Sequence, residues 1–168
     1  MNPSALSPWD IPADWPMPDE LARAHSEALV ELVRAEIAAG GGFLDFARYM
    51  ELALYAPGLG YYSAGARKFG GGGDFVTAPE LSALFSRCLA RSCADVLKQT
   101  GGGNVLELGA GSGVMAADVL RELAACNALP ERYFILERSA DLRKRQQAHL
   151  LRTVPQWLER VRWLDAPP

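Results

Sequence analysis

All 16 glycines of this 168-residue chain lie between Gly40 and Gly113, and the other 94 residues contain none. Glycine lets a backbone adopt positive φ angles and lets a ligand lie directly against the main chain. The places where this chain can turn tightly or expose bare backbone are therefore confined to one window. We expect any binding site built from main-chain atoms to lie within it.

Downstream of residue 103 the apolar pattern changes from helical to strand periodicity. Three strand patterns alternate with two helical patterns, and three alternate glycines stand between the first strand and the first helix. The strand patterns cover residues 105–108, 133–137 and 160–164, and the helical patterns cover residues 114–127 and about 140–151. This alternation is typical of right-handed βαβ units, so the sequence predicts an α/β fold with a parallel sheet.

The first 18 residues differ in composition from everything that follows. They contain five prolines and two tryptophans, Trp9 and Trp15, which excludes a helix or a central strand. They form either a disordered tail or an extended arm. We favour the arm, because a free tail would leave the large apolar surfaces of both tryptophans exposed to water. We expect three regions, namely an arm over residues 1–18, a helical region with a glycine-rich loop over residues 19–100, and a βαβ domain over residues 101–168.

Three helical patterns occupy the middle region. They cover residues 19–39, residues 46–54 and a segment that begins near residue 77. Thr77 and Glu80 have the spacing of a capping box, in which Thr77 is the N-cap and Glu80 reaches back to it. We expect the third helix to bury an apolar face made of Leu81, Leu84, Phe85, Cys88, Leu89 and Val96.

Charge and cysteine content exclude several classes of protein. The formal net charge is −3, which argues against a nucleic-acid binder that relies on bulk positive charge. No apolar run approaches the roughly 18–20 residues of a membrane span, and the first residues lack the features of a secretory signal. Cys88, Cys93 and Cys126 fit neither a CxxC pair nor a zinc spacing, so we expect no metal site. We predict buried thiols in a cytoplasmic protein.

The glycine turn has the form acidic-x-Gly-x-Gly-x-Gly, with Glu107 followed by Gly109, Gly111 and Gly113. A dinucleotide fingerprint requires Gly-x-Gly-x-x-Gly, and Val114 occupies the position where its last glycine would stand. The observed spacing is instead that of S-adenosylmethionine (SAM) sites. SAM has no pyrophosphate, and a carboxylate can approach the cationic amino end of its methionyl part.

Two more acidic residues follow the later strand patterns. Glu137 stands at the end of the second strand, where a carboxylate can accept both ribose hydroxyls of a nucleoside. Asp165 follows the third strand, where an acid can accept from an adenine amine. Either residue could instead be a solvated acid at a strand end, an alternative that carries more weight for Asp165.

Several motifs resemble the MidA-type family of class I SAM-dependent methyltransferases. The residues that carry the resemblance are the glycine turn, Tyr133-x-Ile135-x-Glu137-x-Ser139 with Leu142 and Gln146, Leu54-Tyr55-x-Pro57-Gly58-x-Gly60-Tyr61-Tyr62, Phe69-Gly70, and Gly73-Asp74-Phe75-Val76-Thr77-Ala78-Pro79-Glu80. The resemblance runs from about residue 43 to the end of the sequence. It implies a Rossmann-like methyltransferase fold, here incomplete with about three parallel strands, preceded by an N-terminal helical region.

The family includes a mitochondrial complex I assembly factor that methylates a protein arginine. The resemblance therefore implies SAM as cofactor and a protein substrate that could be a respiratory-chain subunit. Together with the charge and the lack of a long apolar run, it leads us to expect no nucleic-acid partner, no membrane insertion and a possible homo-oligomer. It implies catalytic roles for Asp74 and Glu80, and Asp74 could instead be a turn residue. The implied cofactor-binding residues are Glu107, Gly109, Gly111, Gly113, Glu137 and Asp165.

The family pattern continues beyond the third strand, whereas this sequence ends at Asp165-Ala166-Pro167-Pro168. The family has a fourth strand with an Asn-Glu…Asp-Ala-x-Pro motif that shapes the acceptor site. We therefore expect an N-terminal fragment of a larger methyltransferase, with weak SAM binding and little transfer activity alone.

Three alternative functions remain compatible with the sequence. One is a nicotinamide-dependent oxidoreductase, which the glycine spacing disfavours. Another is a non-catalytic assembly or docking protein that uses a methyltransferase-like fold. The third is a nucleic-acid role for residues 138–162, which carry seven basic and two acidic side chains, a pattern that we interpret as a solvated helix face.

Overall fold

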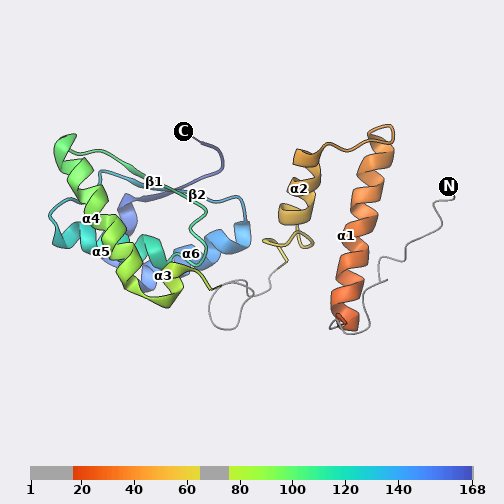
Figure 1. Cartoon of the computed structure of the whole chain (residues 1–168), viewed down its shortest axis with the longest axis horizontal. Coiled ribbons are helices and arrows are strands. Elements are labelled where there is room, and N and C mark those ends of the chain that lie inside the picture. Colours follow the sequence, from red (N-terminus) through yellow and green to blue (C-terminus); the bar gives the residue numbers. More distant parts are fainter. Residues whose placement is uncertain (1–16, 65–75, 168) are drawn as a thin grey trace. The chain divides into compact units, whose positions relative to one another are not determined.

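The computed structural model describes residues 17–64 and 76–167 of the chain (Figure 1). It divides into two compact units, Met1–Asp45 and Phe46–Pro168. Most of the predicted arm, residues 1–16, lies outside the described residues, as does the glycine-rich loop at residues 65–75, which includes Asp74.

The first unit contains one long helix, α1 (Glu20–Ala39). Asp19 is its N-cap, and its carboxylate accepts a 2.7 Å hydrogen bond from the backbone N–H of Ala22. The helix ends where Gly41 adopts a φ of +74°, a conformation that favours glycine. Within the described parts of the chain, no helix is long and apolar enough to cross a membrane.

The second unit begins with α2 (Phe46–Tyr55), after which the chain folds back on the helix end. A Cβ atom at Gly60 would lie 2.5 Å from the backbone nitrogens of Tyr55 and Ala56, so only glycine fits at this crossing. The return places Tyr62 beside the start of the helix that follows the second strand, because its carbonyl accepts a 2.6 Å hydrogen bond from the Ser139 hydroxyl. Tyr62 thereby becomes part of the site described below.

The sheet has three parallel strands in the order β1 (Val105–Leu108), β2 (Tyr133–Leu136) and β3 (Val161–Leu164). The register places Glu107 beside Ile135, and Ile135 beside Trp163. The predicted α/β class with about three parallel strands is confirmed. Because the strands are parallel, their carboxyl ends meet at one edge of the sheet, where ligands bind in folds of this type.

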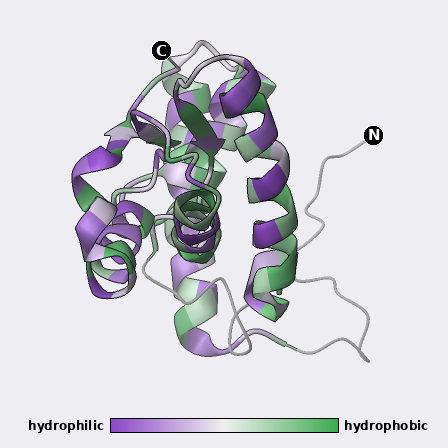
Figure 2. Ribbon diagram, turned by 90° about the vertical axis from the view of Figure 1, so that its left-hand side faces the viewer, coloured by the Kyte–Doolittle hydropathy of each residue, from purple (hydrophilic) through white to green (hydrophobic). Residues whose placement is uncertain are grey.

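Three helices pack on the same face of this sheet, and each carries both hydrophobic and hydrophilic residues (Figures 1 and 2). They are α4 (Ala83–Gln99), α5 (Val114–Ala125) and α6 (Ala140–Thr153). Their buried side chains meet Tyr133, Ile135 and Val161 of the sheet in one core. A short 3₁₀ helix, Pro155–Arg160, precedes β3 and is not predicted by the sequence pattern.

Thr77 is the N-cap residue of the next helix, as predicted, but the predicted capping box is not formed. Thr77 makes no side-chain cap, and the helix that follows it, α3 (Ala78–Leu81), has only four residues. The backbone becomes extended at Ser82, whose hydroxyl accepts a 3.1 Å hydrogen bond from the N–H of Leu84 and caps α4. The carboxylate of Glu80 therefore does not cap the helix. It accepts a hydrogen bond from a different loop.

The predicted apolar face of the third helix is also wrong. Leu81 and Leu84 are 75% and 66% exposed, and Phe85, Cys88, Leu89 and Val96 are exposed as well. The face that α4 buries against α5 consists instead of small residues and one leucine, namely Ser86, Ala90, Ala94 and Leu97. Small side chains let two helices approach closely, so packing selects this face although its hydrophobicity is lower. The prediction of buried thiols fails for Cys88.

Candidate functional site

The glycine turn connects the carboxyl end of β1 to the start of α5. Gly109, Gly111 and Gly113 adopt φ angles of +69°, +54° and +85°, a region that side chains other than glycine rarely enter. Gly113 is the N-cap residue of α5. The sequence at this point therefore produces a stretch of exposed backbone at a helix N-terminus.

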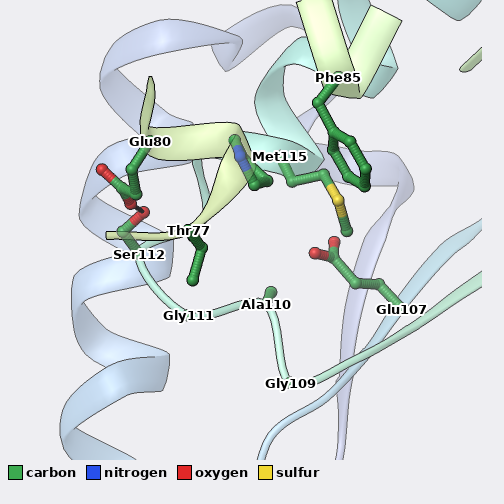
Figure 3. Close-up of a pocket in the computed structure, with 10 residues that line it drawn as sticks. Thr77, Glu80, Phe85, Glu107, Gly109, Ala110, Gly111, Ser112 and Met115 are labelled. Carbon is green, nitrogen blue, oxygen red and sulfur yellow. Dashed lines mark hydrogen bonds between the residues drawn. The ribbon is translucent and has the colours of Figure 1, made fainter. Parts of the chain in front are cut away.

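A cavity of about 270 Å³ lies on one side of the turn (Figure 3). Phe85 and Met115 form its apolar part, and the Glu107 carboxylate points into the same space (Figure 3). The remaining lining residues come from α3 and the turn, and they are Thr77, Pro79, Glu80, Gly109, Ala110, Gly111 and Ser112. A carboxylate beside apolar groups can hold a cationic group of a ligand.

Glu107 is buried, with 6% of its surface exposed. Burial disfavours the ionised carboxylate and raises its pKa to about 7, although a hydrogen bond from Tyr133 acts in the opposite direction. The Tyr133 hydroxyl donates this bond to Oε2 of Glu107 at 2.8 Å. At neutral pH the site therefore holds a carboxyl group that a nearby positive charge would ionise.

A second cavity of about 220 Å³ lies on the other side of the turn and shares Gly109 and Gly111 with the first. Tyr55, Tyr62, Glu137 and Leu142 complete its lining. The chain reversal at Gly60 thus brings Tyr55, at the end of α2, and Tyr62, after the reversal, into one cavity lining with the acid that follows β2. Flat apolar walls beside a carboxylate suit a sugar or a base of a nucleoside.

The Glu137 carboxylate is 5% exposed and is held on both oxygens. Oε1 accepts a 2.9 Å hydrogen bond from the backbone N–H of Ser139, and Oε2 accepts one of the same length from Nε2 of Gln146. A carboxylate offers about four lone-pair positions, so each oxygen retains capacity for one more donor. Glu137 can therefore bind a diol without giving up its present partners.

Glu80 points toward the glycine turn rather than back along its own helix (Figure 3). Its Oε1 accepts a hydrogen bond from the Ser112 hydroxyl. This bond ties α3 to the loop between Gly111 and Gly113. The predicted site residue Glu80 is thus brought to the same cavity as Glu107, from a segment about 30 residues earlier in the chain.

Asp165 lines neither cavity. Its carboxylate is 88% exposed and forms a 2.6 Å ion pair with Arg143 of α6. The structure thus brings together Glu80, Glu107, Gly109, Gly111 and Glu137 but does not bring Asp165 into either cavity lining. Gly113 packs against α6 next to the cavities, and Asp74 lies outside the described residues.

The sequence patterns do not indicate a site role for two side chains, namely Tyr133 and Met115. Tyr133 begins β2 and faces the core, and its hydroxyl reaches Glu107 on the neighbouring strand. The strand alternation places Tyr133 and Ile135 on one face, but only the register reveals that Glu107 lies on that face too. Met115 follows the turn by two residues and is recognised only from the cavity itself.

The residues present fit a cationic nucleoside such as SAM. Typical ligand pockets have volumes of roughly 300–1,000 Å³, and the two adjoining cavities reach this size together. A Cβ atom at Gly109 would meet no other atom within 4 Å, so the backbone there faces open space between the two carboxylates. Acidic groups on both sides favour a ligand with positive charge at one end and hydroxyls at the other.

Comparison with known proteins points to the same class of ligand. Residues 88–168 match a family model for S-adenosyl-L-methionine-dependent methyltransferases. The mitochondrial protein arginine methyltransferase NDUFAF7 of Danio rerio is 40% identical over 83 residues, which are 48% of this chain and 19% of that protein. Its Caenorhabditis elegans homologue is 34% identical over 115 residues, which are 65% of this chain and 27% of that protein.

Solved structures extend the match to most of the described residues. A Burkholderia thailandensis protein crystallised with S-adenosyl-homocysteine is 52% identical, with a TM-score of 0.79 over 91% of this chain and 41% of its own. A native structure from the same organism has a TM-score of 0.74 at 49% identity, over 91% of this chain and 38% of its own. The chain spans about a fifth to a quarter of the length of the curated relatives it matches.

The relatives correct one prediction. The curated proteins from Danio rerio, Caenorhabditis elegans and Drosophila melanogaster are all named as mitochondrial, which contradicts the cytoplasmic location expected from the reduced cysteines. Free thiols are compatible with more than one compartment, so they could not decide this point. The motif resemblance, by contrast, agrees with the matched family model, the relatives and the solved structures. The matched family model, the curated relatives and the solved structures all support a MidA-type family of SAM-dependent methyltransferases for this chain.

Proposed function

We propose that the second unit holds SAM for methyl transfer to an arginine side chain of a protein. The observation that carries this proposal is the meeting of two cavities at the bare backbone of Gly109 and Gly111, with a buried carboxylate on either side. The names of the relatives, which are protein arginine methyltransferases, support the acceptor class. A respiratory-chain subunit as the protein substrate is part of the same proposal, and it rests on the family resemblance.

The cavity that contains Glu107 would take the methionyl end of the cofactor. The carboxylate of Glu107 would pair with the ammonium group, and a positive charge at this place favours the ionised form of a carboxyl group whose pKa is about 7. The exposed backbone of Gly109 and Gly111 lets the ligand chain lie against the main chain. When bound, SAM supplies a methyl group activated by the sulfonium charge.

The cavity that contains Glu137 would take the nucleoside. Each oxygen of this carboxylate has one hydrogen bond from the protein and capacity for another, which matches a ribose diol. Tyr55 and Tyr62 offer aromatic surface on the opposite side of the cavity. Asp165 would accept from the adenine amine only after its ion pair with Arg143 rearranges.

Glu80 and Asp74 are our proposed acceptor-side acids. Glu80 reaches the cavity from α3 and is held by Ser112, so its carboxylate has a fixed position near the place of the methyl group. A carboxylate there can hold a cationic guanidinium and take the proton that it loses on methylation. Asp74 would act from the adjoining loop.

The test is a pair of glycine-to-alanine variants that carry equal backbone strain. Gly109 and Gly101 have φ angles of +69° and +76°, and neither has another atom within 4 Å of an added Cβ. Each variant should lose about 1 kcal/mol of stability from the left-handed backbone. Only Gly109→Ala adds a methyl group to the cavity rim. In calorimetric titrations with S-adenosyl-homocysteine, we expect Gly101→Ala to bind like wild type and Gly109→Ala to bind far more weakly. Absence of heat with the wild-type protein would refute the proposed function.

A further inference from the structure

One buried amide connects the ends of all three strands. Gln146 of α6 is fully buried, and its Nε2 atom donates to the Gly111 carbonyl at 3.1 Å and to Oε2 of Glu137 at 2.9 Å. Its Oε1 atom accepts a 2.9 Å hydrogen bond from the indole of Trp163. Gly111 follows β1, Glu137 follows β2 and Trp163 belongs to β3. Gln146 thus contacts both walls of the second cavity.

The chemistry of the three partners fixes the orientation of this amide. The indole N–H of Trp163 can only donate, so the amide oxygen must face it. The Gly111 carbonyl and the Glu137 carboxylate can only accept hydrogen bonds, so the amide nitrogen must face both. A flipped amide would break all three hydrogen bonds. Trp163 therefore selects the orientation in which Gln146 supports Glu137.

The backbone around Gln146 is built to bring the amide to this point. A Cβ atom at Gly113 would lie 3.3 Å from Cα of Gln146 and 3.5 Å from its Cβ, so the glycine allows α6 to approach the turn closely. Leu142 and Leu150, one turn to either side on α6, are buried as well. The position of the amide is therefore set by packing on three sides, and no solvent competes for its hydrogen bonds.

We propose that Gln146 is a positioning residue for the nucleoside, which holds the Glu137 carboxylate and the glycine turn at the separation that a bound ribose requires. This inference rests on the proposed function. Gln146 lines neither cavity itself, so it would act through Glu137 and Gly111 rather than by touching the ligand. Replacing the amide would leave Glu137 with one protein donor, that of Ser139, and would release the turn.

Two substitutions separate positioning from packing. Gln146→Met keeps the approximate length and shape of the side chain but removes every hydrogen bond. Gln146→Glu keeps the shape and places a second carboxyl group against Glu137, where one of the two must bind a proton. Gln147 is exposed on the same helix, so Gln147→Met and Gln147→Glu are matched controls.

The measurement is the affinity of the full chain for S-adenosyl-homocysteine by calorimetry, with thermal unfolding to show that each variant is folded. We expect Gln146→Met to lower the affinity about tenfold or more, which corresponds to the loss of one hydrogen bond to a charged group. Gln147→Met should leave the affinity unchanged. Gln146→Glu should bind more weakly than wild type at high pH, and this difference from wild type should shrink as pH falls, because a proton shared between the two carboxyl groups restores a donor.

A double-mutant cycle gives the second readout. In a Glu137→Gln background, the loss caused by Gln146→Met should largely disappear, since the group that it positions has changed. Equal affinities of wild type and Gln146→Met, or an undiminished loss in the Glu137→Gln background, would overturn the inference. Absence of binding by the wild type would instead refute the proposed function. If Gln146→Met does not fold, Trp163→Phe removes the indole donor together with part of the ring that packs against the core, and we expect a smaller loss of affinity in the same cycle.

Discussion

The Tyr133 hydroxyl donates a 2.8 Å hydrogen bond to Oε2 of Glu107, and both side chains are buried. The two residues stand on neighbouring strands, with Tyr133 in the core and Glu107 between the core and a cavity. Burial raises the pKa of both groups. Tyr133 therefore remains a neutral donor at any pH near neutrality, while Glu107 titrates near pH 7.

Glu107 should make the stability of the fold fall as the pH rises. The folded protein retains the Glu107 proton up to a pKa of about 7, whereas the unfolded chain releases it near 4.5, so the folded state binds more protons between these values. The free energy of unfolding should thus decrease through this window by about 3 kcal/mol from this residue. Denaturant titrations should show that Glu107→Gln removes this contribution, and an unchanged pH slope would contradict the assignment.

Tyr133→Phe should raise the pKa of Glu107 further, because it removes a hydrogen bond that stabilises the ionised carboxylate. Affinity for S-adenosyl-homocysteine should rise with pH as Glu107 ionises, and the midpoint of this rise should move to higher pH in the variant. Titrations between about pH 5.5 and 8 test this shift. The same variant in a Glu107→Gln background is the control, and a shift that persists there would exclude Glu107 as its origin.

The face that α4 uses to pack can be tested by one substitution on each side of the helix. Ala90 is fully buried against α5, so Ala90→Leu should overpack the interface and cost about 1–3 kcal/mol. Leu84 is 66% exposed, and Leu84→Gln should change stability by less than about 0.5 kcal/mol. Chemical denaturation of both variants provides the comparison. A large loss of stability in Leu84→Gln, with little change in Ala90→Leu, would instead show that α4 packs through the face expected from hydrophobicity.

The strands and the glycine turn are predictable from the sequence because their signals are local. The period of the apolar residues and the alternate glycines from Gly109 to Gly113 depend on no distant partner. The packed face of α4 is not predictable in this way, since it depends on how closely α5 can approach Ala90 and Ala94. The contact between Glu80 and Ser112 likewise joins residues 32 positions apart, so it cannot be predicted from the local sequence. The local sequence instead predicts that Glu80 forms a capping box.

The acids illustrate the same limit. Glu107 and Glu137 line the two cavities, but the partners that set their chemistry, Tyr133 and Gln146, become visible only with the register and the helix packing. Asp165 has an equivalent position after its strand, yet Arg143 from α6 holds its carboxylate at the surface. A strand end predicts where an acid stands, and the surrounding helices determine what it faces.

The most direct test uses the glycines themselves. Amide NMR spectra of protein labelled with ¹⁵N-glycine report on the 16 glycines alone. On titration with S-adenosyl-homocysteine, we expect the signals of Gly109 and Gly111 to move most, with a smaller change at Gly113 and none at Gly101. A titration that leaves the signals of the 109–113 turn in place, or that moves only glycines elsewhere in the chain, would contradict a nucleoside bound against this backbone.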